Sequence, residues 1–434
     1  MKLWSKENTN TSKQIEAFTV GRDNEFDMLL AAHDVEGTIA HVTMLSEAGL
    51  MDASEAKSAI NGLQEIGTDI RNGSFKIEEG VEDIHSQVEL LLTRKIGDAG
   101  KKIHSGRSRN DQVAVDIKLF LREQIRKVKD DTRSLFDLLI KQSNLYKDVL
   151  IPGYTHLQVA MPSSAGLWLG AYAESLADDM IQLASAFQLA NKNPLGSGAG
   201  YGSSFPLNRA RTTQLLRFAG MHYNSVYAQM SRGKTEKVVA QALSSIAATL
   251  SRLAMDCCLY LSQNFGFISF PDELTTGSSI MPHKKNPDVF ELIRAHCNRI
   301  QAVPNELTIL LNNLPSGYHR DLQLTKEILF PAFQQLRNCI EMTSLMMSNI
   351  SFRTDILKDE RYRYIFSVEA VNELVNQGVP FREAYKKVGD KIAEGSFAYD
   401  ISKGLRHTHE GSIGNLNNEK IVEAMEQTLR NFEL

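Results

Sequence analysis

Three long stretches of the chain carry apolar residues at helical spacing. In the stretches 239–260 and 169–190 the apolar positions alternate in steps of four and three residues, and a less regular stripe follows at 117–139. A period of about 3.5 residues places such positions along one side of a helix. At 1.5 Å per residue, these helices are roughly 40 Å long or more. No alternating, strand-like segment of comparable strength accompanies them, so the sequence predicts an all-α fold around a long central helical bundle.

The prolines and glycines suggest three regions. All eleven prolines lie at or after Pro152, and none falls between Pro206 and Pro271, which leaves room for long helices. Shorter amphipathic segments separated by glycines precede the bundle, and a polar stretch follows it. We therefore divide the chain into an N-terminal helical region (1–106), a central helical-bundle domain (107–360) and a C-terminal helical region (361–434).

Composition narrows the classes of partner. The 434 residues are 42% hydrophobic and 23% charged, and 48 basic against 52 acidic residues give a net charge of −4. Such a balance provides no basic field for a nucleic-acid backbone. No apolar run approaches the roughly 18 residues of a membrane span. The polar N-terminus, MKLWSKENTNTSKQ, has no signal-peptide core. We expect a cytoplasmic protein with a small-molecule substrate and neither membrane nor nucleic acid as partner.

The four cysteines do not form a metal-binding or disulfide pattern. They are Cys257, Cys258, Cys297 and Cys339, without a CxxC pair. Reduced cysteines acting as small apolar residues explain them better. We expect no metal ion and no cofactor.

Polar segments that interrupt the apolar stripes are the places to look for chemistry. The first, HSGRSRNDQ at 104–112, precedes the third stripe. Asn110 or Asp111 can cap a helix there, and Arg107 and Arg109 beside the positive helix end would suit a carboxylate. Taken alone, a solvated cap with ordinary surface arginines explains this segment better.

The second segment, PGYTHLQVAMP at 152–162, places Thr155, His156 and Gln158 between two prolines. A histidine exchanges a proton near neutral pH, so His156 is a candidate general acid or base. A lone histidine is more often structural.

The third segment, TTGSSIMPHKKNPD at 275–288, combines features of a catalytic loop. Its glycine and serines suit a mobile loop, and Asn286 followed by Pro287 predicts the start of a helix. Lys284 and Lys285 add positive charge beside that start. The combination favours a carboxylate anion and lowers the pKa of a nearby serine hydroxyl. A purely structural loop rarely has it.

The fourth segment, LPSGYHRDLQLTK at 314–326, brings Tyr318, Gln323 and Lys326 near one predicted helix start. A solvated amphipathic helix start explains this spacing equally well. A glycine-rich stretch at 196–202 resembles a dinucleotide-binding loop only loosely, because it follows a helical stripe instead of a strand.

Together the four segments resemble the fumarase/aspartase superfamily, whose members eliminate or add across fumarate. GSSIMPHKKNPD is similar to the loop of that superfamily, while HSGRSRNDQ, PGYTHLQVAMP and LPSGYHRDLQLTKE resemble the argininosuccinate lyase family. The four matches occur in order over about 100–330, and DVEG near position 34 extends the likeness. This resemblance implies a fumarase/aspartase-like homotetramer with a shared bundle and active sites assembled from three subunits.

The resemblance also implies a reaction, the splitting of argininosuccinate into arginine and fumarate as the last step of arginine biosynthesis. Ser278 would be the base, on a loop that closes over the substrate. Lys284 and the helix start at Asn286 would stabilise the carbanion, and His156, supported by Glu291, would protonate the leaving nitrogen. Exchanged roles for the serine and the histidine stay open. The substrate-binding positions that carry over are Arg109, Asn110, Thr155, Asn286, Tyr318, Gln323 and Lys326.

Two alternatives stay open beside this reading. His283 stands where argininosuccinate lyases more often have glutamine and adenylosuccinate lyases often have histidine, although SRNDQ argues against the latter. A catalytically silent structural protein of the same fold, as in lens crystallins, is opposed by intact Ser278, His156 and Lys284. No residue is carried over from 17–27, and acceptance of an N-acylated argininosuccinate stays open.

Overall fold

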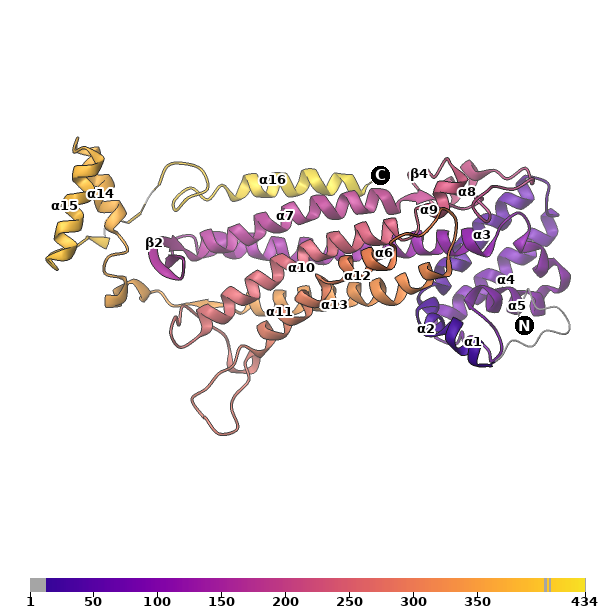
Figure 1. Cartoon of the computed structure of the whole chain (residues 1–434), viewed down its shortest axis with the longest axis horizontal. Helices are drawn as coiled ribbons and strands as arrows, with labels where there is room; N and C mark the ends of the chain where they lie inside the picture. The colour runs from indigo at the N-terminus through magenta and orange to yellow at the C-terminus, as the bar shows by residue number, and fades with distance from the viewer. Residues whose placement is uncertain (1–12, 402–403, 406, 434) are drawn as a thin grey trace.

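The centre of the molecule is a bundle of long helices, as the apolar stripes predict. The computed structural model describes residues 13–401, 404–405 and 407–433. The three striped stretches form α10 (Lys234–Leu261), α7 (Ala165–Ala190) and α6 (Arg109–Leu145), and α11 (Asp288–Ile300) and α13 (Thr325–Ser348) complete the bundle (Figure 1). Nearly every stripe position is buried. The all-α prediction is confirmed.

The ends of these helices show local reasons for their position. Ser108 caps α6: its hydroxyl accepts from the backbone N–H of Asn110, while the carboxylate of Asp111 accepts from the N–H of Ser108 in a reciprocal capping box. The prediction that Asn110 or Asp111 is the cap is therefore wrong, because the serine two residues earlier takes the role. Ser164 caps α7 in the same way, accepting from Leu167.

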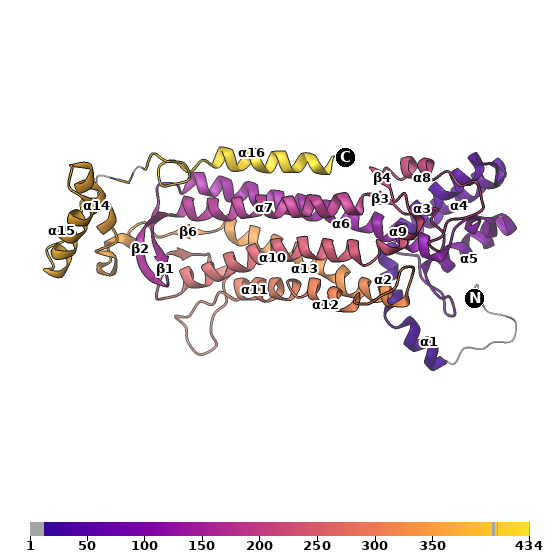
Figure 2. The same cartoon turned by 45° about the horizontal axis from the view of Figure 1, so that its top comes forward.

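Smaller helices cover the two ends of the bundle. The end at which α6, α10 and α13 begin carries α1 (Lys13–Val20), α2 (Asp23–Asp27), α3 (Ala31–Glu47), α4 (Ala53–Arg71), α5 (Ile84–Ile96), α8 (Arg209–Leu215) and α9 (Ser225–Met230). α12 (Val303–Leu310) packs on α10. The opposite end carries α14 (Ser367–Asn376) and α15 (Phe381–Ala393), and α16 (Asn418–Leu429) returns along α7 (Figure 2).

Short strands connect the helices. β1 (Leu150–Thr155) and β2 (Gln158–Ser164) form an antiparallel hairpin at the far end of the bundle. Two further pairs have two residues per strand: β3 (Lys192–Asn193) with β4 (Gly220–Met221), and β5 (Ile268–Ser269) with β6 (Ser351–Phe352). The hairpin contains the second polar segment, which the sequence did not identify as strand.

One stretch, Ser225–Leu261, is long and apolar enough to cross a membrane by length and composition. More than half of its most apolar window is buried inside the molecule, and the core helix of a globular bundle passes the same test. The apolar stripe and the small residues of α10 account for its hydropathy, although polar residues interrupt its apolar run.

Candidate active site

A cavity of about 190 Å³ at the N-terminal end of the bundle brings the first and fourth polar segments together. α2, the start of α6, the α9–α10 turn and the start of α13 surround it. Five of the predicted binding residues line it, namely Arg109, Asn110, Tyr318, Gln323 and Lys326. Asn110 and Lys326, which are 216 positions apart in the sequence, therefore line the same polar cavity.

Lys326 and Gln323 fasten the start of α13 to the N-terminal helices. The buried ammonium of Lys326 forms ion pairs with Asp27 and with Asp23, the latter at 2.7 Å. The amide of Gln323 donates to the carbonyl oxygens of Thr19 and Val20, at 3.0 and 3.3 Å. Burial and the nearby Asp27 charge raise the pKa of Asp23 to about 6, although Lys326 opposes this shift.

Arg109 is already engaged by protein groups on the cavity wall. Its Nε lies 3.1 Å from Asp83, and its two terminal nitrogens donate to Gln112 (2.8 Å) and Ser86 (3.0 Å). A carboxylate bound by Arg109 would have to share these donors. Asn110 follows it on the first turn of α6.

Asp34, His85 and Asp116 form a buried acid–histidine cluster beside the cavity, and His85 is part of the cavity lining. His85 Nδ1 lies 2.9 Å from Asp34 and 3.4 Å from Asp116, and Gln112 donates to Asp34 at 2.6 Å. Burial opposes ionisation of Asp34, but the charges of His85 and Arg107 hold its pKa below the usual range. Burial and the Asp34 charge raise the pKa of Asp116. Ligand atoms of the cluster lie within 4.8 Å of one another and could bracket a cation, although His85 Nδ1 is already hydrogen-bonded to Asp34.

The glycine-rich stretch 196–202 holds a carboxylate of its own chain. The backbone N–H groups of Gly196 and Gly198 both donate to Asp111 at 2.9 Å. Burial raises the pKa of Asp111 to about 6 despite these donors. The stretch thus positions the first turn of α6, in agreement with its rejection as a dinucleotide loop.

Thr155 and His156 lie elsewhere, at the exposed tip of the β1–β2 hairpin. Thr155 pairs with Gln158, so His156 and Leu157 form a two-residue turn, and both have positive φ, +55° and +56°. Such turns favour Asn-Gly, because other residues are strained at positive φ. Leu157 is 71% exposed. The hairpin thus presents a histidine and an apolar side chain together.

The third segment forms an extended loop before α11. The Ser278 hydroxyl accepts from the N–H groups of Ile280 and Met281, and Lys284 is exposed. The prediction that Asn286 caps α11 is wrong: Pro287 holds that position, while the Asn286 amide donates to Gly277 and its N–H pairs with Thr276. Backbone pairing across the base of the loop replaces the cap.

The predicted site residues therefore do not meet within one chain. Within the described residues, no hydrogen bond or ion pair joins His156 to Ser278, Lys284 or Glu291, and Glu291 is exposed on the first turn of α11. The hairpin and the loop before α11 lie toward one end of the bundle, and the polar cavity lies at the other (Figure 1).

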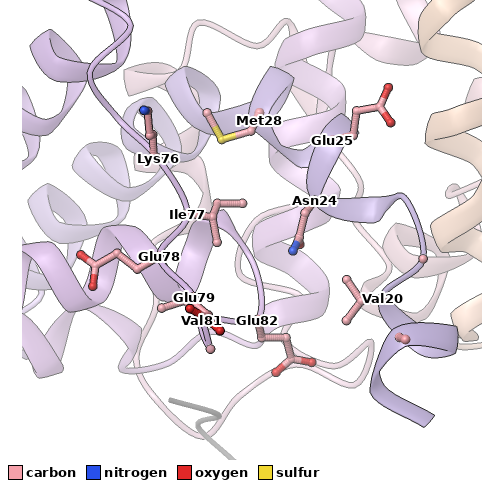
Figure 3. A pocket seen from close by; sticks show the side chains of 13 residues that line it. Val20, Asn24, Glu25, Met28, Lys76, Ile77, Glu78, Glu79, Val81 and Glu82 are labelled. Carbon is pink, nitrogen blue, oxygen red and sulfur yellow. The ribbon is translucent and has the colours of Figure 1, made fainter. Parts of the chain in front are cut away.

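A larger cavity of about 800 Å³ adjoins the polar one and shares Val20, Asn24 and Glu82 with it. Figure 3 shows α2 on one side of this space and the segment 76–82 on the other. Four glutamates and one lysine line it, and two of the glutamates, Glu25 and Glu78, are paired with Arg22 and Arg94.

Sequence reasoning missed several residues of the polar cavity, notably Asp23, Asp27, His85 and Arg232. The first two lie in the stretch from which no residue was carried over. For Arg232 the sequence does contain a signal, because an arginine and a glycine stand shortly before the long apolar stripe at 239–260.

Comparison with known proteins adds independent information. The model of a family described as "Lyase" matches residues 7–302. The argininosuccinate lyase of Phocaeicola vulgatus is 59% identical over 431 residues, covering 99% of this chain and 96% of its own, and that of Stenotrophomonas maltophilia is 39% identical over 410 residues, covering 93% and 95%. Among solved structures, an EDDS lyase in complex with formate matches with a TM-score of 0.76 at 21% identity, covering 98% of this chain and 91% of that one. A fumarate lyase:delta crystallin from Brucella melitensis gives 0.71 at 18%, covering 93% and 91%. At these identities the structures show the fold alone.

Proposed function

The chain belongs to the argininosuccinate lyases of the lyase family and cleaves argininosuccinate to arginine and fumarate, and we propose that each of its active sites is assembled from several subunits of a homotetramer. One observation carries the proposal: the residues that the reaction needs lie at opposite ends of a long bundle. A chain of this shape brings them together only through another copy of itself.

Exposed apolar side chains support an assembly. Both the hairpin and the loop before α11 present them, and so do the bundle helices α7, α10, α11 and α13. Unpartnered apolar surface of this kind is typical of subunit interfaces. The side chains are Leu157, Val159, Met161, Ile280, Met281, Ile181, Met255, Leu292, Met342 and Leu345.

We assign three parts to each site. The polar cavity, with Asn110, Tyr318, Gln323 and Lys326, binds the substrate. The hairpin of a second subunit supplies Thr155 and His156. The loop of a third supplies Ser278, Lys284 and Asn286.

The reaction then divides among these groups. Ser278 Oγ takes the proton from the carbon next to a succinate carboxylate, and Lys284 with the neighbouring backbone N–H groups stabilises the negative charge that develops on that carboxylate. As the carbon–nitrogen bond breaks, His156 gives a proton to the leaving guanidinium nitrogen, and Glu291 supports it. Enclosure by neighbouring subunits excludes water, which strengthens each of these interactions.

Four free cysteines, three of them buried, support a reducing, cytoplasmic location for the enzyme.

The proposal is tested by following fumarate at its ultraviolet absorbance with argininosuccinate and, separately, adenylosuccinate. We expect fumarate from argininosuccinate alone. Fumarate from adenylosuccinate alone would mean that His283, and not the SRNDQ segment, indicates the substrate. No fumarate from either substrate would favour a catalytically silent structural protein. Light scattering should give four times the chain mass of 48.5 kDa; a monomeric active enzyme would refute the shared site.

A further inference from the structure

Arg232 is a cation of the polar cavity that the reaction scheme above leaves without a role. It lies in the turn between α9 and α10, and its side chain is 2% exposed. Its Nε lies 3.2 Å from Glu236 and its Nη2 donates to the carbonyl oxygen of Leu322 at 3.3 Å. Its Nη1 is buried without a hydrogen-bond partner in the described part of the chain. Buried guanidinium nitrogens are normally satisfied, so this one calls for an acceptor.

The backbone holds Arg232 at this place. Gly233, which follows it, has φ +74°, and a Cβ there would lie 2.3 Å from Leu311 Cδ2. A larger residue at 233 would therefore strain the backbone and require the Leu311 side chain to move. The first turn of α10 begins beside the guanidinium, and the positive end of the helix dipole adds to its charge.

The surrounding charges indicate the ligand. The cavity contains carboxylates as well as cations, including Asp23 and Asp83, and Lys326 is already paired with two carboxylates. A free guanidinium donor next to carboxylates complements a zwitterion that carries a carboxylate and an ammonium on the same carbon. An α-amino acid end has this form.

We propose that Arg232 binds the α-carboxylate of the arginine half of the substrate. The inference rests on the proposed function, because it takes argininosuccinate as the ligand. Arg232 donates to the carbonyl oxygen of Leu322, the residue before Gln323. Arg232 therefore also positions the part of the fourth polar segment that lines the cavity.

The test compares arginine with agmatine, which is arginine without its carboxylate. Binding of each to the assembled enzyme is measured by titration calorimetry. A charge-assisted hydrogen bond favours arginine by about 10–100-fold in the native enzyme. We expect Arg232→Gln to reduce that preference to within about twofold, mainly by weakening arginine, and Arg232→Lys to keep part of it. An unchanged preference in Arg232→Gln would overturn the inference.

Two variants separate binding from folding. Arg122 is another buried arginine, with donors to Asn191, Leu216 and Arg217, and it does not line the cavity. Arg122→Gln should lower thermal stability and keep the arginine preference. The double variant Arg232→Gln/Glu236→Gln removes both charges of this ion pair; it should lose the preference while folding, and retention of the preference would refute the role.

Cleavage of argininosuccinate by the native enzyme is recorded in the same preparation. If the native enzyme cleaves argininosuccinate but Arg232→Gln keeps the preference for arginine over agmatine, only the role of Arg232 is refuted. If the native enzyme shows no turnover, the proposed function is refuted.

Discussion

Mixed tetramers test the shared site directly. His156→Asn disables the hairpin part of each site and Ser278→Ala disables the loop part, so each variant alone should be nearly inactive. If the two parts come from different subunits, a site is intact when its hairpin comes from the Ser278→Ala chain and its loop from the His156→Asn chain. With equal amounts and random assembly, each condition holds for half of the sites, so about a quarter of the native activity returns.

The assay uses co-expression of the two variants with different affinity tags, tandem purification of mixed tetramers, and fumarate absorbance. A matched control pairs His156→Asn with Thr155→Val. Both changes lie in the same hairpin, so no assortment gives an intact site and activity should stay at the level of the single variants. Equal activity in the two mixtures would refute the assignment of hairpin and loop to different subunits.

Further predictions concern the base, the packing and the pH dependence. Ser278→Ala should lower kcat by roughly 10²-fold or more, as loss of an acid–base group does, with circular dichroism unchanged; near-native turnover would remove Ser278 as the base. Gly166→Ala should cost about 1–3 kcal/mol in urea unfolding, because its Cβ would lie 2.5 Å from Lys147 Cα, whereas Gly389→Ala, with nothing within 4 Å, should be neutral or stabilising. Burial and Arg107 lower the pKa of His41 to about 3, so its neutral form stabilises the fold above pH 6.5 and this stabilisation is lost as the pH falls toward 3. His41→Gln should remove about 1.4 kcal/mol per pH unit from the pH dependence of unfolding between pH 6 and 4, and equal slopes would contradict the shift.

The spacing of apolar residues predicted the bundle helices correctly, because this spacing depends only on residues that are close together in the sequence. In α10 the apolar residues recur with the period of the helix, and the tertiary structure buries that side. The same reasoning failed for the β1–β2 hairpin, in which β1 buries two neighbouring residues and the first part of β2 is mostly exposed, so the strands show no regular alternation. It also failed at Asn286, where pairing with Thr276 ten residues earlier decides the geometry.

The polar cavity could be predicted only in part. Asn110, Tyr318, Gln323 and Lys326 were found through motifs, but their partners depend on long-range contacts. Gln323 donates to Thr19 across 304 positions of sequence, and no local pattern encodes such a pair.

The hairpin tip connects conformational strain with assembly. His156 and Leu157 occupy positive φ without being glycine or asparagine, at a cost of about 1–3 kcal/mol each. In the isolated chain Leu157 is 71% exposed, so burial of its side chain does not offset that cost. Burial of Leu157 in a subunit interface would contribute about 1.5–3 kcal/mol, which is comparable to the strain at one of the two residues. In the proposed assembly, the contact that holds the turn at His156 is also a contact between subunits, so we expect activity and assembly to be lost together when Leu157 is made polar.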